Sequence, residues 1–300
     1  MDDIEDFNRD ISENTKKNRK ILFELNSFCN KHIENENDTQ SDKEKIDSYN
    51  IKDVFSKYLL RLGRDNKMIV KKIDLILEYR KALENKTITQ NILLEKLLCK
   101  KPSRSISGIT SITLVMSPYP NGQSFSCKHN CYYCPNEPAH EGNNWQAQPR
   151  SYLFNEPAVR RANQNNFQAC EQMIDRMNTL YKNGHTIDKL EIILEGGTYT
   201  EYPIEYLEDY IRDIYYSANT YFDKNLRDKN TLNSEVFENR LTKVHIIGVC
   251  IETRPDAIVT ETENWIPHFR QCGITRIQLG VQSTHNHILK KLNRGHTVED

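Results

Sequence analysis

Residues 124–138 of the chain have the sequence SFSCKHNCYYCPNEP, and they follow a β-branched, apolar run, ITSITLVM, over residues 109–116. The cysteine stretch gathers Cys127, Cys131 and Cys134 within eight residues, although the whole chain has only eight cysteines. The apolar run is typical of a buried strand. A C-x3-C-x2-C loop directly after such a strand can bring three thiolates around one metal centre, so we predict a metal site at the end of this strand.

Three further runs after this loop predict strands: KLEIILEGGT at 189–198, KVHIIGVCIETRPD at 243–256 and ITRIQLGVQS at 274–283. Helical patterns lie between them, the first over residues 156–183, whereas the polar residues 220–240 predict a long loop or insertion. Strands that alternate with helices indicate a parallel sheet or barrel, so we predict an α/β fold for residues 105–300.

The ends of these three predicted strands are polar or rich in glycine. They have the sequences Glu195-Gly196-Gly197-Thr198, Glu252-Thr253-Arg254 and Gly280-Val281-Gln282-Ser283. Parallel βα units place their chemistry at the carboxyl ends of the strands. We therefore expect these motifs to share one site with the cysteine loop.

Charge divides the first third of the chain into two segments. Residues 1–50 carry 13 acidic and 8 basic side chains, a net charge of −5, and predict an acidic arm that is flexible at least between residues 30 and 47. Residues 51–104 carry 6 acidic and 14 basic side chains, a net charge of +8, and have helical patterns. They predict a basic helical region that includes Lys71 and Lys72. This region is either a solvated face or a docking surface for a polyanion such as RNA.

Composition excludes a membrane or secreted protein. No apolar run approaches the roughly 20 residues that span a bilayer, and the acidic N-terminus lacks the apolar core of a secretory signal. We expect a cytoplasmic protein, with a nuclear pool possible, that has no membrane partner and keeps its thiols reduced. A cysteine cluster in such a protein indicates metal or catalytic chemistry rather than disulfides.

Three cysteines are one ligand short of a structural zinc site, which takes four. His129 or His140 could supply the fourth ligand. An iron–sulfur cluster with three protein ligands would instead leave one iron open to a small molecule, and ligand softness permits either metal. The other cysteines are scattered and are predicted to be small buried residues or free thiols: Cys29, Cys99, Cys170, Cys250 and Cys272.

The cysteine spacing, the preceding strand and the aromatic Tyr133 before the last cysteine resemble the radical S-adenosylmethionine superfamily. The resemblance implies a partial radical S-adenosylmethionine (βα) barrel in which Cys127, Cys131 and Cys134 hold a [4Fe–4S] cluster. It also implies that the open iron binds S-adenosylmethionine and that one electron cleaves it to a 5′-deoxyadenosyl radical. The implied cofactor contacts are Tyr133, Gly196, Gly197, Thr198 and Gln282, with Glu252 and Arg254 as polar contacts to the ribose or carboxylate.

Longer segments resemble the catalytic subunit family of the Elongator complex. In family order between Lys101 and Asp300 they are KPSRSISGITSITLVMSP, RSYLFNEPAVRRA, GHTIDKLEIILEGGTY, IGVCIETRPD, IQLGVQS and NRGHTVED. The resemblance implies that a carboxymethyl precursor passes from acetyl-CoA to C5 of the wobble uridine of tRNA. It implies Lys189, Glu252 and Arg254 as catalytic residues, with Lys189 also in contact with acetyl-CoA. The implied partners are tRNA and Elongator-like accessory subunits.

The same resemblance suggests further residues around the site. Tyr152, Glu156 and Arg161 match residues that shape its mouth, and Arg294 and His296 are candidates for RNA or cofactor contacts.

The chain departs from that family in two respects. Asn136-Glu137-Pro138 replaces the glycines after the third cysteine, and the first two cysteines have the short superfamily spacing. The resemblance stops at Asp300, inside the expected barrel and before the expected acetyltransferase domain, so we expect an N-terminal portion of a longer protein. The alternatives are a radical S-adenosylmethionine enzyme with a different substrate and a catalytically inactive scaffold.

Overall fold

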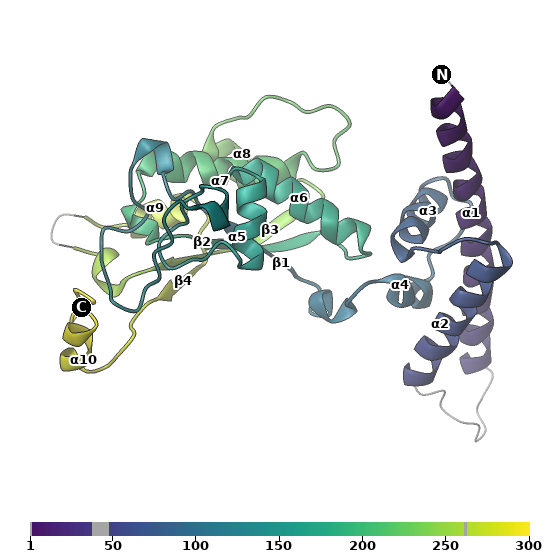
Figure 1. The fold of residues 1–300 in the computed structure, drawn as a ribbon, viewed down its shortest axis with the longest axis horizontal. Helices are drawn as coiled ribbons and strands as arrows, with labels where there is room; N and C mark the ends of the chain where they lie inside the picture. Colours follow the sequence, from purple (N-terminus) through teal and green to yellow (C-terminus); the bar gives the residue numbers. More distant parts are fainter. Residues whose placement is uncertain (1, 38–47, 261–262) are drawn as a thin grey trace. The chain divides into compact units, whose positions relative to one another are not determined.

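The computed structural model describes residues 2–37, 48–260 and 263–300, with side chains over residues 13–32, 51–260 and 263–300. The chain divides into two compact units (Figure 1). The helical unit comprises Met1–Ile106 with Thr179–Thr186, and the α/β unit comprises Ser107–Asn178 with Ile187–Asp300. Residues 38–47, which include part of the stretch predicted to be flexible, lie outside the described residues.

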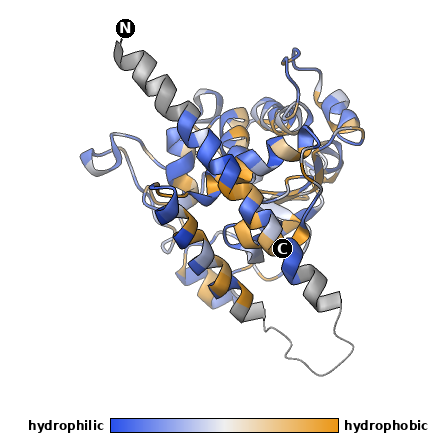
Figure 2. Ribbon diagram, turned by 90° about the vertical axis from the view of Figure 1, so that its right-hand side faces the viewer, coloured by the Kyte–Doolittle hydropathy of each residue, from blue (hydrophilic) through white to orange (hydrophobic). Residues whose placement is uncertain are grey.

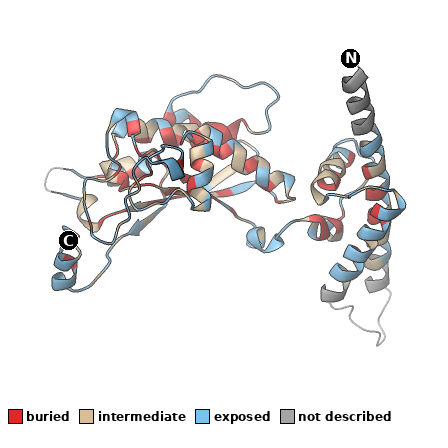
Figure 3. Ribbon diagram, viewed as in Figure 1, coloured by how far each residue is buried: buried red, intermediate tan, exposed pale blue. Residues whose placement is uncertain are grey.

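The helical unit is built around one hydrophobic core. Its elements are α1 (Asp2–Asn37), α2 (Ser48–Asp65), α3 (Lys72–Glu84), α4 (Ile92–Leu98) and a 3-10 turn, Pro102–Ser105. Each α-helix contributes side chains that are no more than 1% exposed, including Leu25, Phe55, Leu75 and Leu94. The helices carry hydrophilic as well as hydrophobic residues (Figure 2), and buried and exposed residues follow one another along them (Figure 3). This pattern is typical of amphipathic helices that pack together.

The described part of the predicted acidic arm is a packed helix. In α1, Leu22, Leu25 and Cys29 have no exposed surface. Asn91, the N-cap of α4, donates from Nδ2 to Asn26 at 3.0 Å and also bonds α1 one turn later. The spacing of the apolar residues gives α1 a face that can be buried, and this outweighs the polar composition of the segment.

The α/β unit contains a parallel sheet with the strand order β1-β2-β3-β4. The strands are β1 (Thr110–Val115), β2 (Lys189–Glu195), β3 (His245–Thr253) and β4 (Arg276–Leu279). The order of the strands in the sheet is the same as their order along the chain, which is the arrangement of successive βα units. The predicted parallel α/β fold is therefore confirmed. Within the described residues β1 and β4 are the edges of an open sheet, and closure into a barrel is not seen there.

The helices of this unit lie between successive strands, except α10, which follows β4. They are α5 (Pro157–Gln164), α6 (Ala169–Lys182, whose last residues belong to the helical unit), α7 (Ile204–Asn219), α8 (Leu232–Glu238), α9 (Ile266–Gln271) and α10 (Asn286–Lys291), with 3-10 turns at Pro120–Gly122, Glu141–Asn143, Tyr199–Glu201 and Pro255–Ala257. The helix predicted over residues 156–183 is two helices, because Asn166 and Phe167 have φ angles of 49° and 56° that break it. None of the described helices is long and apolar enough to cross a membrane.

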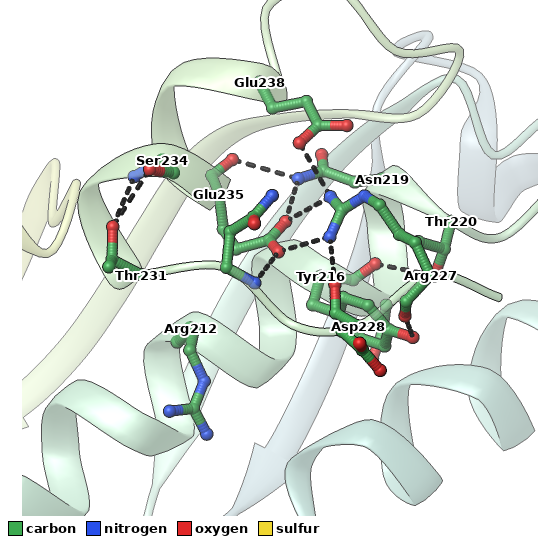
Figure 4. A network of polar contacts seen from close by, with 12 residues as sticks. Arg212, Tyr216, Asn219, Thr220, Arg227, Asp228, Thr231, Ser234, Glu235 and Glu238 are labelled. Carbon is green, nitrogen blue, oxygen red and sulfur yellow. Dashed lines mark hydrogen bonds and ion pairs between the residues drawn. The ribbon is translucent and has the colours of Figure 1, made fainter.

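A partly buried ion-pair network organises residues 220–240, which the sequence predicts as a long loop (Figure 4). Arg227 forms a bidentate pair with Glu235, both distances being 2.7 Å, and contacts Glu238 at 2.7 Å. Glu235 is fully buried and also accepts from Asn219 at 2.8 Å. Burial alone would raise the pKa of Glu235, but the hydrogen bonds, chiefly from Arg227, hold it below its usual value. The segment is therefore anchored by polar contacts, which apolar periodicity cannot predict.

We expect Leu25→Ala to destabilise the helical unit by about 2–4 kcal/mol, because it leaves a cavity at a position without solvent exposure. Hydrogen exchange of the whole chain, followed by mass spectrometry, should become faster in peptides from α1 and α3. The matched control is Lys20→Ala, on the exposed side of the same helix, which should change stability by less than about 0.5 kcal/mol. Equal protection in the two variants would contradict the packing of α1 into the core.

Candidate functional site

A cavity of about 260 Å³ opens at the carboxyl ends of the strands in the α/β unit. Its lining comes from the cysteine loop, from residues 150–152 and from the ends of β2, β3 and β4. The structure thus brings together the motifs that were expected to share one site. Such a position is where parallel α/β folds bind their ligands.

A close backbone contact holds the cysteine loop against the end of β2. The Thr198 amide donates to the Ser126 carbonyl at 3.0 Å, and the Thr198 hydroxyl donates to the Cys127 sulfur at 3.2 Å. A Cβ atom at Gly197 would lie 1.8 Å from the Ser126 carbonyl oxygen, so a side chain cannot be accommodated there. The Gly197 amide donates to the Tyr202 hydroxyl at 3.0 Å, which fixes the turn from the other side. The glycine motif therefore sets the position of Cys127.

Two arginines surround Cys131, which is 2% exposed. Nη1 of Arg294 lies 3.7 Å and Nη1 of Arg254 lies 4.0 Å from its Sγ. Arg254 is held by a bidentate pair with Asp256, both distances being 2.9 Å, and Arg294 donates to the Gly280 carbonyl at 2.7 Å. Positive charge is thus fixed beside this sulfur, an environment that suits an anionic thiolate ligand.

Two carboxyl groups meet where β2 and β3 end. Glu252 lines the cavity and accepts a hydrogen bond from the Tyr152 hydroxyl at 2.8 Å. Glu195 is the last residue of β2, just beyond its last pair with β3. Burial, followed by the charges of Glu252 and Glu156, raises the pKa of Glu195 to about 7. The predicted motif at the end of β2 includes Glu195, but no role was predicted for it, although an acidic residue near the end of each of two adjacent strands was the signal for this pair.

Most of the predicted site residues line the cavity. They are Cys127, Cys131, Cys134, Tyr133, Gly196, Gly197, Thr198, Glu252, Arg254 and Gln282. Tyr152 and Arg294, which the family resemblance placed around the site, line it as well. Arg150 and Gln278 also line it, and sequence reasoning did not single them out because neither belongs to one of the strand-end motifs.

Lys189 is separated from this cavity. It is the first residue of β2, is exposed, and lies at the opposite end of the strand from Glu195. At roughly 3.3 Å per residue the strand spans about 20 Å, which accounts for the separation. Glu156, Arg161 and His296 are likewise not among the described residues that line the cavity.

The three cysteines line a shared cavity. No group of three or more His, Cys, Asp or Glu side chains among the described residues is arranged to hold a metal ion. His140, considered as a zinc ligand, instead accepts from the Gly142 amide at 3.0 Å and lies 3.1 Å from Glu137. His129 lines the cavity, and burial followed by the charge of Arg254 lowers its pKa. A four-ligand zinc site is therefore not built in the described part of the chain.

Comparison with known proteins gives a consistent set of relatives. No protein-family model matches the chain. The chain is 36% identical over 201 residues to a tRNA uridine(34) acetyltransferase of Dehalococcoides mccartyi, covering 67% of the chain and 39% of the relative. It is 35% identical over 226 residues to a protein of the same name from Methanocaldococcus infernus, and this match covers 75% of the chain and 38% of the relative. It is 35% identical over 206 residues to Elongator complex protein 3 of Saccharomyces cerevisiae, and this match covers 69% of the chain and 35% of the relative.

A solved structure is also similar, namely the archaeal Methanocaldococcus infernus Elp3 with an N-terminal deletion (1–46). The identity is 28%, the TM-score is 0.45, and the match covers 64% of this chain and 33% of that one. The chain spans 35–39% of the length of the curated relatives described above.

We expect Glu195→Gln to raise the Tm at about pH 8 much more than at about pH 5. The pKa of Glu195 in the folded protein, about 7, lies above its ordinary value of 4.5, so stability is full below about pH 4.5 and is lost as the pH rises through 7. Gln resembles the protonated carboxyl at every pH. The gain at the higher pH should be about 1–2 kcal/mol, since solvent screens part of the charge interaction. Thermal unfolding at both pH values measures it, with the exposed Glu171→Gln on α6 as control. An equal change at both pH values would contradict the raised pKa.

We expect Gly197→Ala to displace the cysteine loop, because a methyl group would overlap the Ser126 carbonyl. Loss of this contact should destabilise the α/β unit by about 2–4 kcal/mol. It should also speed the labelling of Cys127 by a thiol reagent, read by peptide mass spectrometry. Ser124→Ala, an exposed position in the same loop, is the control. Unchanged stability and labelling would show that the loop does not depend on this glycine.

Proposed function

Since the chain belongs, over about two thirds of its length, to the family of the tRNA uridine(34) acetyltransferases and Elongator complex protein 3, we propose that it is part of a transferase that modifies the wobble uridine of tRNA. The observation that carries the proposal is the meeting of the C-x3-C-x2-C loop with three strand-end motifs around one cavity. Because the chain spans 35–39% of those relatives, the activity and partners of the whole protein are part of the proposal.

The proposed chemistry belongs to the radical S-adenosylmethionine class, on a partial (βα) barrel. Cys127, Cys131 and Cys134 would hold a [4Fe–4S] cluster. The donor set suits this group, because all three thiols are free and line one cavity, and cysteine thiolates are the usual ligands of such clusters. When bound, the cluster would supply an open iron for S-adenosylmethionine and the electron that cleaves it to a 5′-deoxyadenosyl radical.

The chain's own residues would bind and orient the cofactor. Gly196 and Gly197 line the cavity at the end of β2, and Thr198 fixes the first cysteine. Tyr133, between Cys131 and Cys134 in the sequence, lines the cavity, where its ring can pack against an adenine. Gln282 lines the cavity with a left-handed φ of 66°, which directs this part of the loop after β4.

Glu252 and Arg254 would act in different ways. The hydrogen bond from Tyr152 orients the Glu252 carboxylate in the cavity wall, where it can accept from ribose hydroxyl groups. The Arg254 side chain is buried, and its guanidinium pairs with Asp256 and contacts the Cys131 sulfur. We therefore assign Arg254 to positioning of the cysteine rather than to direct catalysis.

Substrates and partners follow from the family. Acetyl-CoA as a substrate and its contact with Lys189 rest on the sequence resemblance, and Lys189 would act from the opposite end of β2. The names of the relatives favour tRNA as the macromolecular substrate and a complex with Elongator-like subunits as the setting. The basic segment 51–104 of the helical unit is the proposed tRNA surface.

The test is anaerobic reconstitution of the chain with iron and sulfide, then addition of S-adenosylmethionine and a reductant. We expect iron–sulfur absorption and 5′-deoxyadenosine, with more product when acetyl-CoA and tRNA are present. Cys134→Ala should abolish both signals, because one of three cluster ligands is lost. Cys170→Ala, a partly buried cysteine outside the cavity, is the matched control.

Two outcomes would overturn parts of this proposal. Equal iron binding and cleavage in the Cys134→Ala and Cys170→Ala variants would exclude the cysteine site. Cleavage by the wild type that is indifferent to acetyl-CoA and tRNA would favour a radical enzyme with another substrate.

A further inference from the structure

A second cavity, of about 230 Å³, lies in the helical unit and is lined by three lysines. Lys52 comes from α2, Lys72 from the first turn of α3 and Lys96 from α4. Apolar residues form much of the remaining wall, including Phe55 and Leu97. No carboxylate belongs to the described residues that line it. The cavity is therefore a concentration of positive charge without a matching anion in its wall.

Lys72 is the inner member of this group. Its ammonium donates to the Leu97 carbonyl at 2.6 Å and lies 5.7 Å from the centre of the Phe55 ring. Burial and then the neighbouring charge of Lys52 lower its pKa, while Cys99 acts in the opposite direction. One carbonyl group and one aromatic ring compensate only part of the cost of removing the Lys72 ammonium from water. The remaining donors of Lys72 are available for a ligand.

The position of Lys72 on its helix adds a second unfavourable feature. Lys71 is the N-cap of α3, forms no capping hydrogen bond with its side chain, and is followed by Lys72 as the first helical residue. The N-terminus of a helix carries partial positive charge and favours anions, so two lysines there reduce stability. Asp74 in the first turn offsets this only in part. A sequence that gives up local stability in this way is typical of a functional site.

We propose that the cavity formed by Lys52, Lys72 and Lys96 binds a phosphate group. One phosphate group would compensate the unmatched charge of the three lysines, because its oxygens accept from several ammonium groups and offset their repulsion. It would also supply the negative charge that the N-terminus of α3 favours. Lysine binds phosphate as a point charge, which suits a cavity reached by three flexible side chains. The phosphate group could belong to an RNA backbone or to a free phosphate compound. The choice of RNA rests on the proposed tRNA function, whereas the phosphate site itself does not.

The test uses the full chain and the double variant Lys52→Gln with Lys96→Gln. Both side chains are exposed, so the core is left intact. The matched control is Lys20→Gln with Lys57→Gln, two exposed lysines of the same unit outside the cavity lining, with the same change of charge. Titration calorimetry with inorganic phosphate probes the site alone. Fluorescence anisotropy with tRNA, over a series of salt concentrations, probes RNA as the source.

We expect the cavity variant to bind inorganic phosphate about tenfold more weakly than the control variant. We expect its affinity for tRNA to fall about tenfold and the salt slope to decrease by about 1, the value for one lost phosphate contact. A loss confined to inorganic phosphate would support the site and assign it to a free phosphate compound. Equal binding of both probes by the two variants would overturn the proposal. Neither probe requires the iron–sulfur chemistry, so a failure here is distinguishable from failure of the cysteine site.

Discussion

The approach of the Gly197 backbone to the Ser126 carbonyl is the constraint on which the site depends. It joins the loop after β1 to the end of β2, and the adjacent Thr198 uses both its amide and its hydroxyl to fix that loop. Two strands of an ordinary parallel sheet thereby become one rigid support for Cys127. The remaining contacts, from the ends of β3 and β4, are arranged around a position that this backbone contact has already set.

The pairing of charged groups is the second organising principle, and the two units differ in it. Around Cys131 the guanidinium groups are neutralised or held by Asp256 and a carbonyl group, so positive charge is available to a sulfur ligand without being free to move. In the segment of residues 220–240 the Arg227–Glu235 pair is fully matched and serves to hold the chain. The lysines that line the cavity of the helical unit have no carboxylate among the described residues of its wall, and the proposed phosphate group would supply the missing negative charge.

Sequence patterns predicted the parallel α/β unit and the gathering of the strand-end motifs, because these follow from apolar periodicity and from the common direction of parallel strands. They missed features that depend on single residues or on long-range contacts. The helix over residues 156–183 is broken by the left-handed backbone at Asn166 and Phe167, whose residue types do not require it. The polar composition of the segment that forms α1 predicted an acidic arm, because its buried apolar residues are few within a polar sequence. The sequence placed Glu195 in a strand-end motif, but its raised pKa comes from burial and then from the charge of Glu252, which a linear pattern does not encode.

The carboxyl pair at the ends of β2 and β3 also links the occupancy of the cavity to protons in solution. A carboxyl group with a pKa of about 7 is only partly ionised in a neutral buffer. Glu252, which lines the cavity, is one of the charges that raise this pKa. A positively charged ligand at Glu252 would favour the ionised form of Glu195 and release a fraction of a proton on binding, whereas an anionic ligand would cause proton uptake. The heat of binding would then vary with the ionisation enthalpy of the buffer. Whether protons are released or taken up on binding therefore indicates the sign of the charge of the ligand, without any reaction taking place.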